Sequence, residues 1–123
     1  MAKILVVDDE SKIRKIFNKL LTYENYEVLE AEDCRSASRL LVEEKEIQLV
    51  LLHFNMPTMD GSVLYRTIRV VNPKVKVIVT SAFPIQDQKA RIECADDYYD
   101  KSQGTPLLIE KIKKFLPHNV QQA

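Results

Sequence analysis

The chain alternates apolar, β-branched segments with amphipathic helical segments five times, and this alternation constrains the fold more than any other feature. Such a pattern is typical of an α/β protein with a doubly wound parallel sheet. Residues 47–52 form the longest continuous apolar strand segment, as expected at the buried centre of a parallel sheet. The other predicted strands are Lys3–Val7, Tyr26–Ala31, Val75–Thr80 and Asp97–Lys101. The last of them is short and polar, which favours an edge position.

The segments between the strands carry apolar residues at helical spacing. In the first, with Ser11 as the predicted N-cap, the spacing is i, i+3, i+4, i+7, i+8, which predicts one buried stripe. The residues predicted to face the core are Ile13, Ile16, Phe17, Leu20 and Leu21; Ala37, Leu40 and Leu41 within 35–44; Val63, Leu64, Ile68 and Val71 after Gly61; Ile85, Ala90 and Ile92 within 85–93; and Leu108, Ile109, Ile112, Phe115 and Leu116 after Pro106.

Length and charge predict one domain, residues 1–117, followed by a flexible tail, 118–123. The chain has 123 residues, and its 18 basic side chains balance 18 acidic ones, so no overall field attracts nucleic acid or an anionic membrane. No apolar run reaches the roughly 20 residues that span a bilayer. Cys34 and Cys94 lie in no CxxC or Cys/His cluster, which favours reduced thiols in a cytoplasmic protein.

Polar residues end four of the predicted strands. They are Asp8 with Asp9, His53, Ser81 and Lys101. In an open parallel sheet, ligands bind beyond the carboxyl ends of the strands, where the strand order reverses. These side chains therefore form the candidate site.

From Lys3 through Leu116 the chain resembles the receiver domain of bacterial two-component response regulators. The resemblance rests on three segments, residues 3–10 (KILVVDDE), 48–61 (QLVLLHFNMPTMDG) and 95–101 (ADDYYDK). It implies a flavodoxin-like, five-stranded parallel sheet with strand order 2-1-3-4-5. It also implies a Mg²⁺ site in which Asp9 binds directly, Asp8 typically binds through water, and Asn55 contributes its backbone carbonyl.

The resemblance further assigns roles around the phosphoryl group. Ser81 matches the hydroxyl that hydrogen-bonds a phosphoryl oxygen, and Lys101 matches the lysine that pairs with the phosphoryl group and the acceptor carboxylate. Phe83 matches the aromatic switch that turns inward on activation. Position 53 is the phosphoacceptor aspartate in that family, and here it is histidine.

Three residues depart from the family pattern, and two of them lie at or beside the phosphorylation machinery. His53 replaces the carboxylate that would attack phosphorus and lend an oxygen to the cation, so Mg²⁺ binding should be weakened and no cofactor is required. The change also leaves Lys101 without its expected carboxylate partner. Ser102 stands where proline usually follows the lysine, which predicts a trans peptide bond. Cys94 stands where a glycine commonly closes the fourth helix.

The sequence leaves several roles open for His53. It can fill the old acceptor pocket, hydrogen-bonding Asp8, Asp9 or water; act as a cation that fixes one conformation; bind a transition metal with the two aspartates; or carry phosphate itself. If no phosphoryl group arrives, Phe83 should stay packed. Tyr98 and Tyr99 either contribute to a partner surface or alternate, with one ring buried and one exposed.

These observations predict a phosphorylation-independent, receiver-like domain that is not an enzyme and that works by protein–protein contact in a two-component pathway. The expected partners are a histidine kinase, a phosphotransfer protein or an output domain, with no nucleic acid or membrane bound by this domain. The alternatives are a metal- or ligand-responsive switch that uses Asp8, Asp9 and His53, or a phospho-receiver inactivated by an Asp-to-His substitution at position 53.

Overall fold

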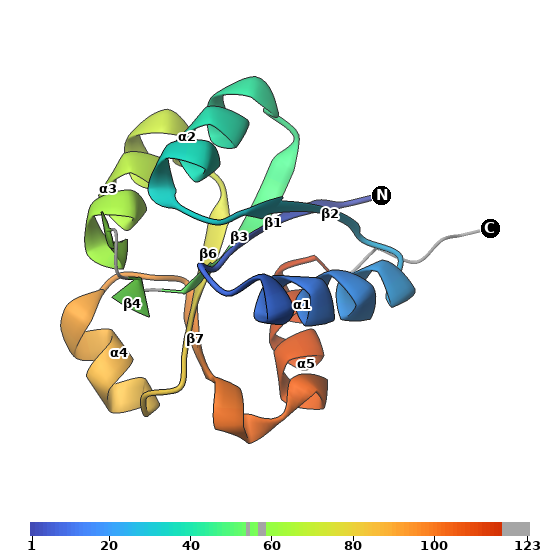
Figure 1. Ribbon diagram of the computed structural model, residues 1–123, viewed down its shortest axis with the longest axis vertical. Helices are drawn as coiled ribbons and strands as arrows, with labels where there is room; N and C mark the ends of the chain where they lie inside the picture. The colour runs from blue at the N-terminus through green and yellow to red at the C-terminus, as the bar shows by residue number, and fades with distance from the viewer. Residues whose placement is uncertain (54, 57–58, 117–123) are drawn as a thin grey trace.

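The apolar segments of the chain pair side by side in one parallel sheet in the computed structural model (Figure 1). The structure describes residues 1–53, 55–56 and 59–116. The strands of this sheet are β1 Lys3–Val7, β2 Glu27–Ala31, β3 Ile47–His53, β6 Lys76–Ser81 and β7 Asp97–Asp100. Two short strands, β4 Asn55–Met56 and β5 Met59–Asp60, form a separate antiparallel pair that the sequence did not predict.

The strand order of the sheet is β2-β1-β3-β6-β7, with every neighbouring pair parallel. In chain order these five strands give the predicted arrangement 2-1-3-4-5, so the flavodoxin-like, doubly wound fold is confirmed. Strand β3 lies at the centre and β7 at an edge, as their apolar and polar sequences indicated. The strand order reverses between β1 and β3, which places the predicted site at the carboxyl ends of these two strands.

Helices cover both faces of the sheet (Figure 1). Successive side chains of a strand point to opposite faces, so Leu5 and Val7 of β1 enter one core cluster while Ile4 and Val6 enter the other. Helices α2 and α3 contribute to the first cluster, and α1 and α5 to the second. The helices are α1 Ser11–Tyr23, α2 Cys34–Glu43, α3 Gly61–Val71, α4 Ile85–Arg91 and α5 Thr105–Phe115, with a 3₁₀ turn η1 Lys101–Gln103.

Several predicted helix details are wrong. Ser11 is the first residue of α1 rather than its N-cap; Glu10 takes that position, and its side chain makes no capping hydrogen bond. The outer members of the apolar stripes, Ile16 and Val63, are exposed, because the buried face of each helix is narrower than its apolar stripe. Ala90 is exposed as well, because Gln88 is the α4 residue that faces the sheet.

Both tyrosines of β7 are buried, which contradicts each of the two alternatives predicted for them. Tyr98 packs in the cluster with α2 and α3, and Tyr99 packs in the cluster with α1 and α5. An edge strand still has two faces, and here helices cover both of them. Burial raises the pKa of each phenol above its ordinary value of 10.0.

The remaining predictions concern termini, cysteines and backbone. Cys34 is buried, Cys94 is exposed, and both are free thiols, as expected. The described backbone contains no cis peptide bond, in line with a trans bond before Ser102. None of the described helices is long and apolar enough to cross a membrane. Pro117 and the predicted tail 118–123 lie outside the described residues.

Candidate functional site

Four strands deliver polar side chains to one end of the sheet. Asp8 follows β1, His53 ends β3, Ser81 ends β6 and Lys101 follows β7. The strand register brings these ends level, because Val7 pairs with Leu52, His53 with Thr80 and Ser81 with Asp100. The prediction that these side chains lie at one edge of the sheet is therefore confirmed.

Asp8 is the fixed centre of this site. It is 1% exposed, and both of its carboxylate oxygens accept hydrogen bonds. The backbone N–H of Glu10 donates to Oδ1 at 2.9 Å, and Lys101 Nζ donates to Oδ2 at 2.9 Å. Its backbone is held too, since its N–H donates to the Ala31 carbonyl and its own carbonyl accepts from Arg14 Nη1. A buried carboxylate with this many partners keeps its position without a bound ion.

Lys101 lacks the carboxylate partner expected at position 53, but it has another carboxylate partner in Asp8. Asp8, at the end of β1, provides that partner across the ends of β3 and β6. Lys101 Nζ also lies 3.3 Å from His53 Nδ1, so the ammonium bridges the acid and the imidazole. The sequence could not identify Asp8 as the carboxylate that pairs with Lys101, because the position of Lys101 Nζ depends on the path of η1.

The contact with Lys101 defines the hydrogen-bonding role of His53. An ammonium group has donors only, so Nδ1 can join this contact only as an acceptor, which requires a neutral imidazole with its proton on Nε2. Nε2 faces Asp9, with 3.9 Å to Oδ1, and Nδ1 lies 3.9 Å from Asp8 Oδ2. Both separations are too long for hydrogen bonds. Of the roles considered for His53, this arrangement favours filling the old acceptor pocket over acting as a cation, but its contact is with Lys101 rather than with the expected Asp8 or Asp9.

Ser81 and Phe83 form the other side of the site. Ser81 is buried, and its Oγ accepts a hydrogen bond from the Phe83 backbone N–H at 3.0 Å. The hydroxyl thus shapes the turn between β6 and α4. The side chain of Phe83 is 40% exposed, so the expectation that this ring would be packed is wrong. The assignment of Phe83 as an aromatic switch stays a prediction.

Asp8, Asp9 and His53 could together hold a metal ion. One ligand atom from each of them lies within 4.8 Å of the others. The two carboxylates suit Mg²⁺, but the third donor is nitrogen, which Mg²⁺ accepts poorly. Asn55, the other predicted ligand, begins β4 and pairs with Asp60, and its role in metal binding stays a prediction.

Sequence reasoning missed two polar networks, one beside the site and one at the opposite end of β6 and β7. Gln88 is fully buried and its Nε2 donates to the carbonyls of Phe83 and Tyr99, at 2.9 and 3.0 Å. Its spacing, three residues after Ile85 and four before Ile92, places all three on one helical face and was the available signal. The other network ties Arg69 to Asp96 at 2.7 Å and to Tyr65 Oη at 3.1 Å, and no sequence pattern indicated it.

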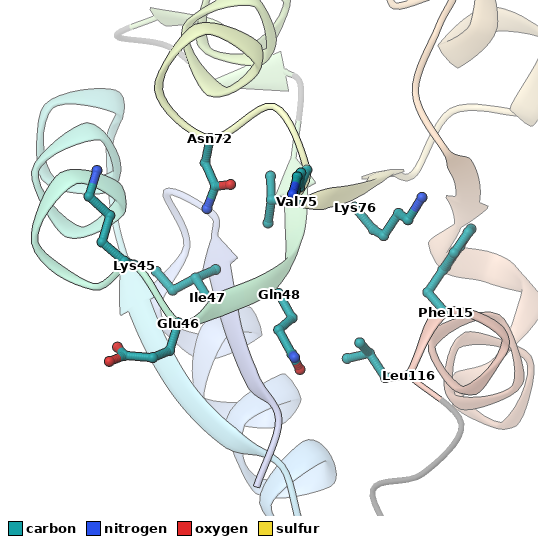
Figure 2. A pocket seen from close by; sticks show the side chains of 10 residues that line it. Lys45, Glu46, Ile47, Gln48, Asn72, Val75, Lys76, Phe115 and Leu116 are labelled. Carbon is teal, nitrogen blue, oxygen red and sulfur yellow. The ribbon is translucent and has the colours of Figure 1, made fainter.

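A hollow lies at the opposite end of the sheet (Figure 2). It encloses about 540 Å³ beside the start of β3 and the end of α5. The side chains around it are a mixture of polar, apolar and charged groups, namely Lys45, Glu46, Ile47, Gln48, Asn72, Lys74, Val75, Lys76, Phe115 and Leu116. It lies at the amino ends of the strands, away from the predicted site, so the two are separate features.

Comparison with known proteins identifies a family. The family model described as the response regulator receiver domain matches residues 4–113. Sporulation initiation phosphotransferase F of Bacillus subtilis is 29% identical over 117 residues, which are 94% of each chain. The transcriptional regulatory protein AruR of Pseudomonas aeruginosa is 32% identical over 93% of this chain but only 49% of its own length. The chain thus spans about half of such transcriptional regulators.

Solved structures agree with this match. The response regulator protein TrrA of Thermotoga maritima, crystallised in complex with Mg²⁺ and BeF, superposes with a TM-score of 0.85 at 33% identity. That alignment covers 94% of this chain and 99% of TrrA. TrrA in complex with the histidine kinase ThkA gives a TM-score of 0.83 at 34% identity, with the same coverage.

Proposed function

Since the chain belongs to the response regulator receiver domain family, we propose that it acts in two-component signalling through protein contacts, without accepting a phosphoryl group at position 53. The observation that carries this proposal is the bridge from Lys101 to Asp8 and His53. This bridge involves two groups of the family reaction, the nucleophile at position 53 and the positively charged lysine.

The nucleophile is the first difference. A carboxylate at position 53 would attack phosphorus with an oxygen, whereas an imidazole has a single lone pair available when neutral. In this structure Nδ1 faces the Lys101 ammonium, and Nε2 faces Asp9. Neither nitrogen is placed as a free nucleophile, and phosphoryl transfer depends chiefly on positioning and charge stabilisation.

The environment of the lysine is the second difference. In the family the lysine pairs with the phosphoryl group, so its charge is used when that group arrives. Here Lys101 Nζ already lies 2.9 Å from a buried carboxylate and 3.3 Å from an imidazole nitrogen. The site is thus satisfied internally, which supports an output conformation that is set by the sequence itself rather than by a donor.

The names of the related proteins suggest which partners this chain binds. A relative of similar length has been crystallised with a histidine kinase, and several longer relatives are transcriptional regulators. We propose a histidine kinase, a phosphotransfer protein or an output domain as the partner, in the cytoplasm, with no substrate turned over. Bound Mg²⁺ would be held weakly by Asp8 and Asp9.

Intact mass after incubation with a small phosphodonor and Mg²⁺ tests the proposal. The parent protein should gain no phosphoryl group, and neither should His53→Asn, which offers an amide at the same position. His53→Asp restores the carboxylate and should become phosphorylated, because Asp9, Ser81 and Lys101 match the family's other site positions. Phosphorylation of the parent at a level similar to that of His53→Asp would refute the proposal.

A second candidate function is a phospho-receiver silenced by one substitution, and the retained positions of Asp8, Ser81 and Lys101 favour it. This candidate requires that His53→Asp alone restores both phosphorylation and an activation-like change in the amide NMR spectrum. If His53→Asp takes up phosphate without a change around α4 and β7, the switch itself has been lost, which favours the phosphorylation-independent function.

A further inference from the structure

We propose that Asp8, Asp9 and His53 form a site for a first-row transition-metal dication, such as Zn²⁺, in preference to Mg²⁺. The proposal does not depend on the proposed function, since a receiver that accepts no phosphate can bind metal or fail to do so. It rests on the donor set, the spacing of the donor atoms, the charge of the site and the position of Lys101.

The donor set is the first argument. Mg²⁺ prefers oxygen ligands in near-ideal octahedral geometry, whereas an imidazole nitrogen with two carboxylates suits Zn²⁺ and its neighbours. Replacing an acceptor carboxylate with His53 therefore weakens the site for Mg²⁺ and improves it for softer ions. The substitution changes which metal is bound rather than simply removing a ligand.

The spacing of the donor atoms is the second argument. Two ligands on one tetrahedral Zn²⁺ lie roughly 3.4 Å apart, given metal–ligand distances near 2.1 Å. His53 Nε2 and Asp9 Oδ1 are 3.9 Å apart, and the three donor atoms all lie within 4.8 Å of one another. Rotamer adjustments of a few tenths of an ångström at Asp9, which is partly exposed, bring the closest pair to bonding geometry.

Charge and access are the third argument. Asp8 and Asp9 contribute two negative charges and Lys101 one positive charge, so a dication still meets a net negative site. The side chains of Asp8, His53 and Asp9 are 1%, 13% and 29% exposed. The ion would therefore be anchored on its inner side and open to water near Asp9.

Lys101 makes the proposal specific. A metal on Nε2 requires the neutral imidazole to carry its proton on Nδ1, where it now accepts from Lys101. That N–H must then donate to water or to another acceptor, because Asp8 serves as a ligand of the ion on the other side of the ring. Metal binding and the Lys101–His53 contact thus exclude each other, and a bound ion would displace the ammonium from His53.

Zn²⁺ titration in competition with a chromophoric chelator tests the site, with Mg²⁺ titrated separately. The parent should bind one Zn²⁺ more tightly than Mg²⁺. His53→Ala should weaken Zn²⁺ binding by at least about tenfold with little change for Mg²⁺. His53→Gln, which keeps a neutral polar side chain, guards against a folding defect and should show the same selective loss. Equal Zn²⁺ affinity in the parent and both variants would overturn the proposal.

Three further variants make the result specific. His118→Ala removes the other histidine of the sequence, and Cys94→Ser removes the exposed thiol; neither should alter Zn²⁺ affinity. Loss of binding in either one would place the ion elsewhere and overturn the proposal. Lys101→Met should raise Zn²⁺ affinity, because it removes the competing cation, and an unchanged or lower affinity would contradict the proposed exclusion.

NMR of the imidazole nitrogens gives a readout that is independent of affinity. On Zn²⁺ addition, the ¹⁵N signals of His53 should show metal at Nε2 and a proton at Nδ1. No response of the His53 nitrogens to saturating Zn²⁺ would refute the site, whatever the phosphorylation experiment shows.

Discussion

Helices α2 and α4 lie at comparable places in the chain, each between two strands of the sheet, but different forces hold them. Helix α2 has ten residues, an Asp33 side chain that caps its first turn, and Cys34, Ala37 and Leu41 buried on its inner face. Helix α4 has seven residues and no side-chain cap, and its buried residue is Gln88. Phe83, just before α4, is exposed.

The difference between α2 and α4 indicates which part of the domain can move. Apolar burial on three of its residues holds α2, whereas α4 has apolar contacts at its two ends, Ile85 and Ile92, and between them the hydrogen bonds from Gln88 to backbone carbonyls. The buried Gln88 Oε1 has no hydrogen-bond partner among the described residues. A polar contact can be exchanged for another one at small net cost, whereas an apolar face cannot leave the core cheaply. Asp8 is buried and held through its backbone and both carboxylate oxygens, so its side of the site is rigid, whereas the Ser81–Phe83 side, next to α4, is the adaptable one.

The largest expected effect is a cavity under α2. Leu41→Ala removes a fully buried side chain and should lower the free energy of unfolding by about 3 kcal/mol. Ala90→Gly on the exposed face of α4 should cost only about 0.5–1 kcal/mol, the ordinary helix penalty of glycine. Urea unfolding of both variants measures these free energies. Equal losses of stability would contradict the contrast between α2 and α4.

Lys101→Met tests the rigid side of the site. The substitution leaves the Asp8 carboxylate buried without its charged partner, which should cost about 2 kcal/mol; the loss is less than for a fully buried pair because the Lys101 side chain is partly exposed. Lys113→Met, on an exposed pair with Glu24, serves as the matched control and should change stability by less than about 0.5 kcal/mol. Thermal and urea unfolding measure both, and a stabilised Lys101→Met would contradict the account.

Gln88→Ala tests the adaptable side. The variant loses two hydrogen bonds to backbone carbonyls and also removes an unpaired oxygen, so the net cost should be about 1 kcal/mol. Amide hydrogen exchange should rise mainly in residues 82–91. Uniformly faster exchange across α2 as well would show that the two helices do not differ in the way proposed.

The smallest expected effect is a pH dependence of the α2 cap. The backbone N–H and hydroxyl of Ser36 donate to Asp33, which lowers the pKa of that carboxyl below its ordinary value of 3.8. The stability that this cap contributes is therefore present above that value and is lost as the pH falls through the lower folded pKa. Asp33→Ala should be less stable than the parent near neutral pH and approach it in acid. A stability difference that stays constant with pH would contradict this cause.

Much of the fold could be predicted from the sequence because apolar periodicity and strand composition act locally. Strand β3 was predicted within one residue, and the sheet order followed from the family resemblance. Gln88 was missed because one of its partners, the Tyr99 carbonyl, lies on another strand. The β4–β5 pair was missed because each strand has only two residues, too few to show an alternating pattern. The site residues were correctly placed at one end of the sheet, but not the Lys101–Asp8 pair, whose geometry depends on η1.

The central claim is that neutral His53 accepts from Lys101 and so completes the site without phosphate. Long-range ¹H–¹⁵N NMR of the metal-free protein near neutral pH reads this directly, with His118→Ala used to assign the signals. The account predicts an unprotonated, hydrogen-bonded Nδ1 and a protonated Nε2. A proton on Nδ1, alone or together with one on Nε2, would contradict it.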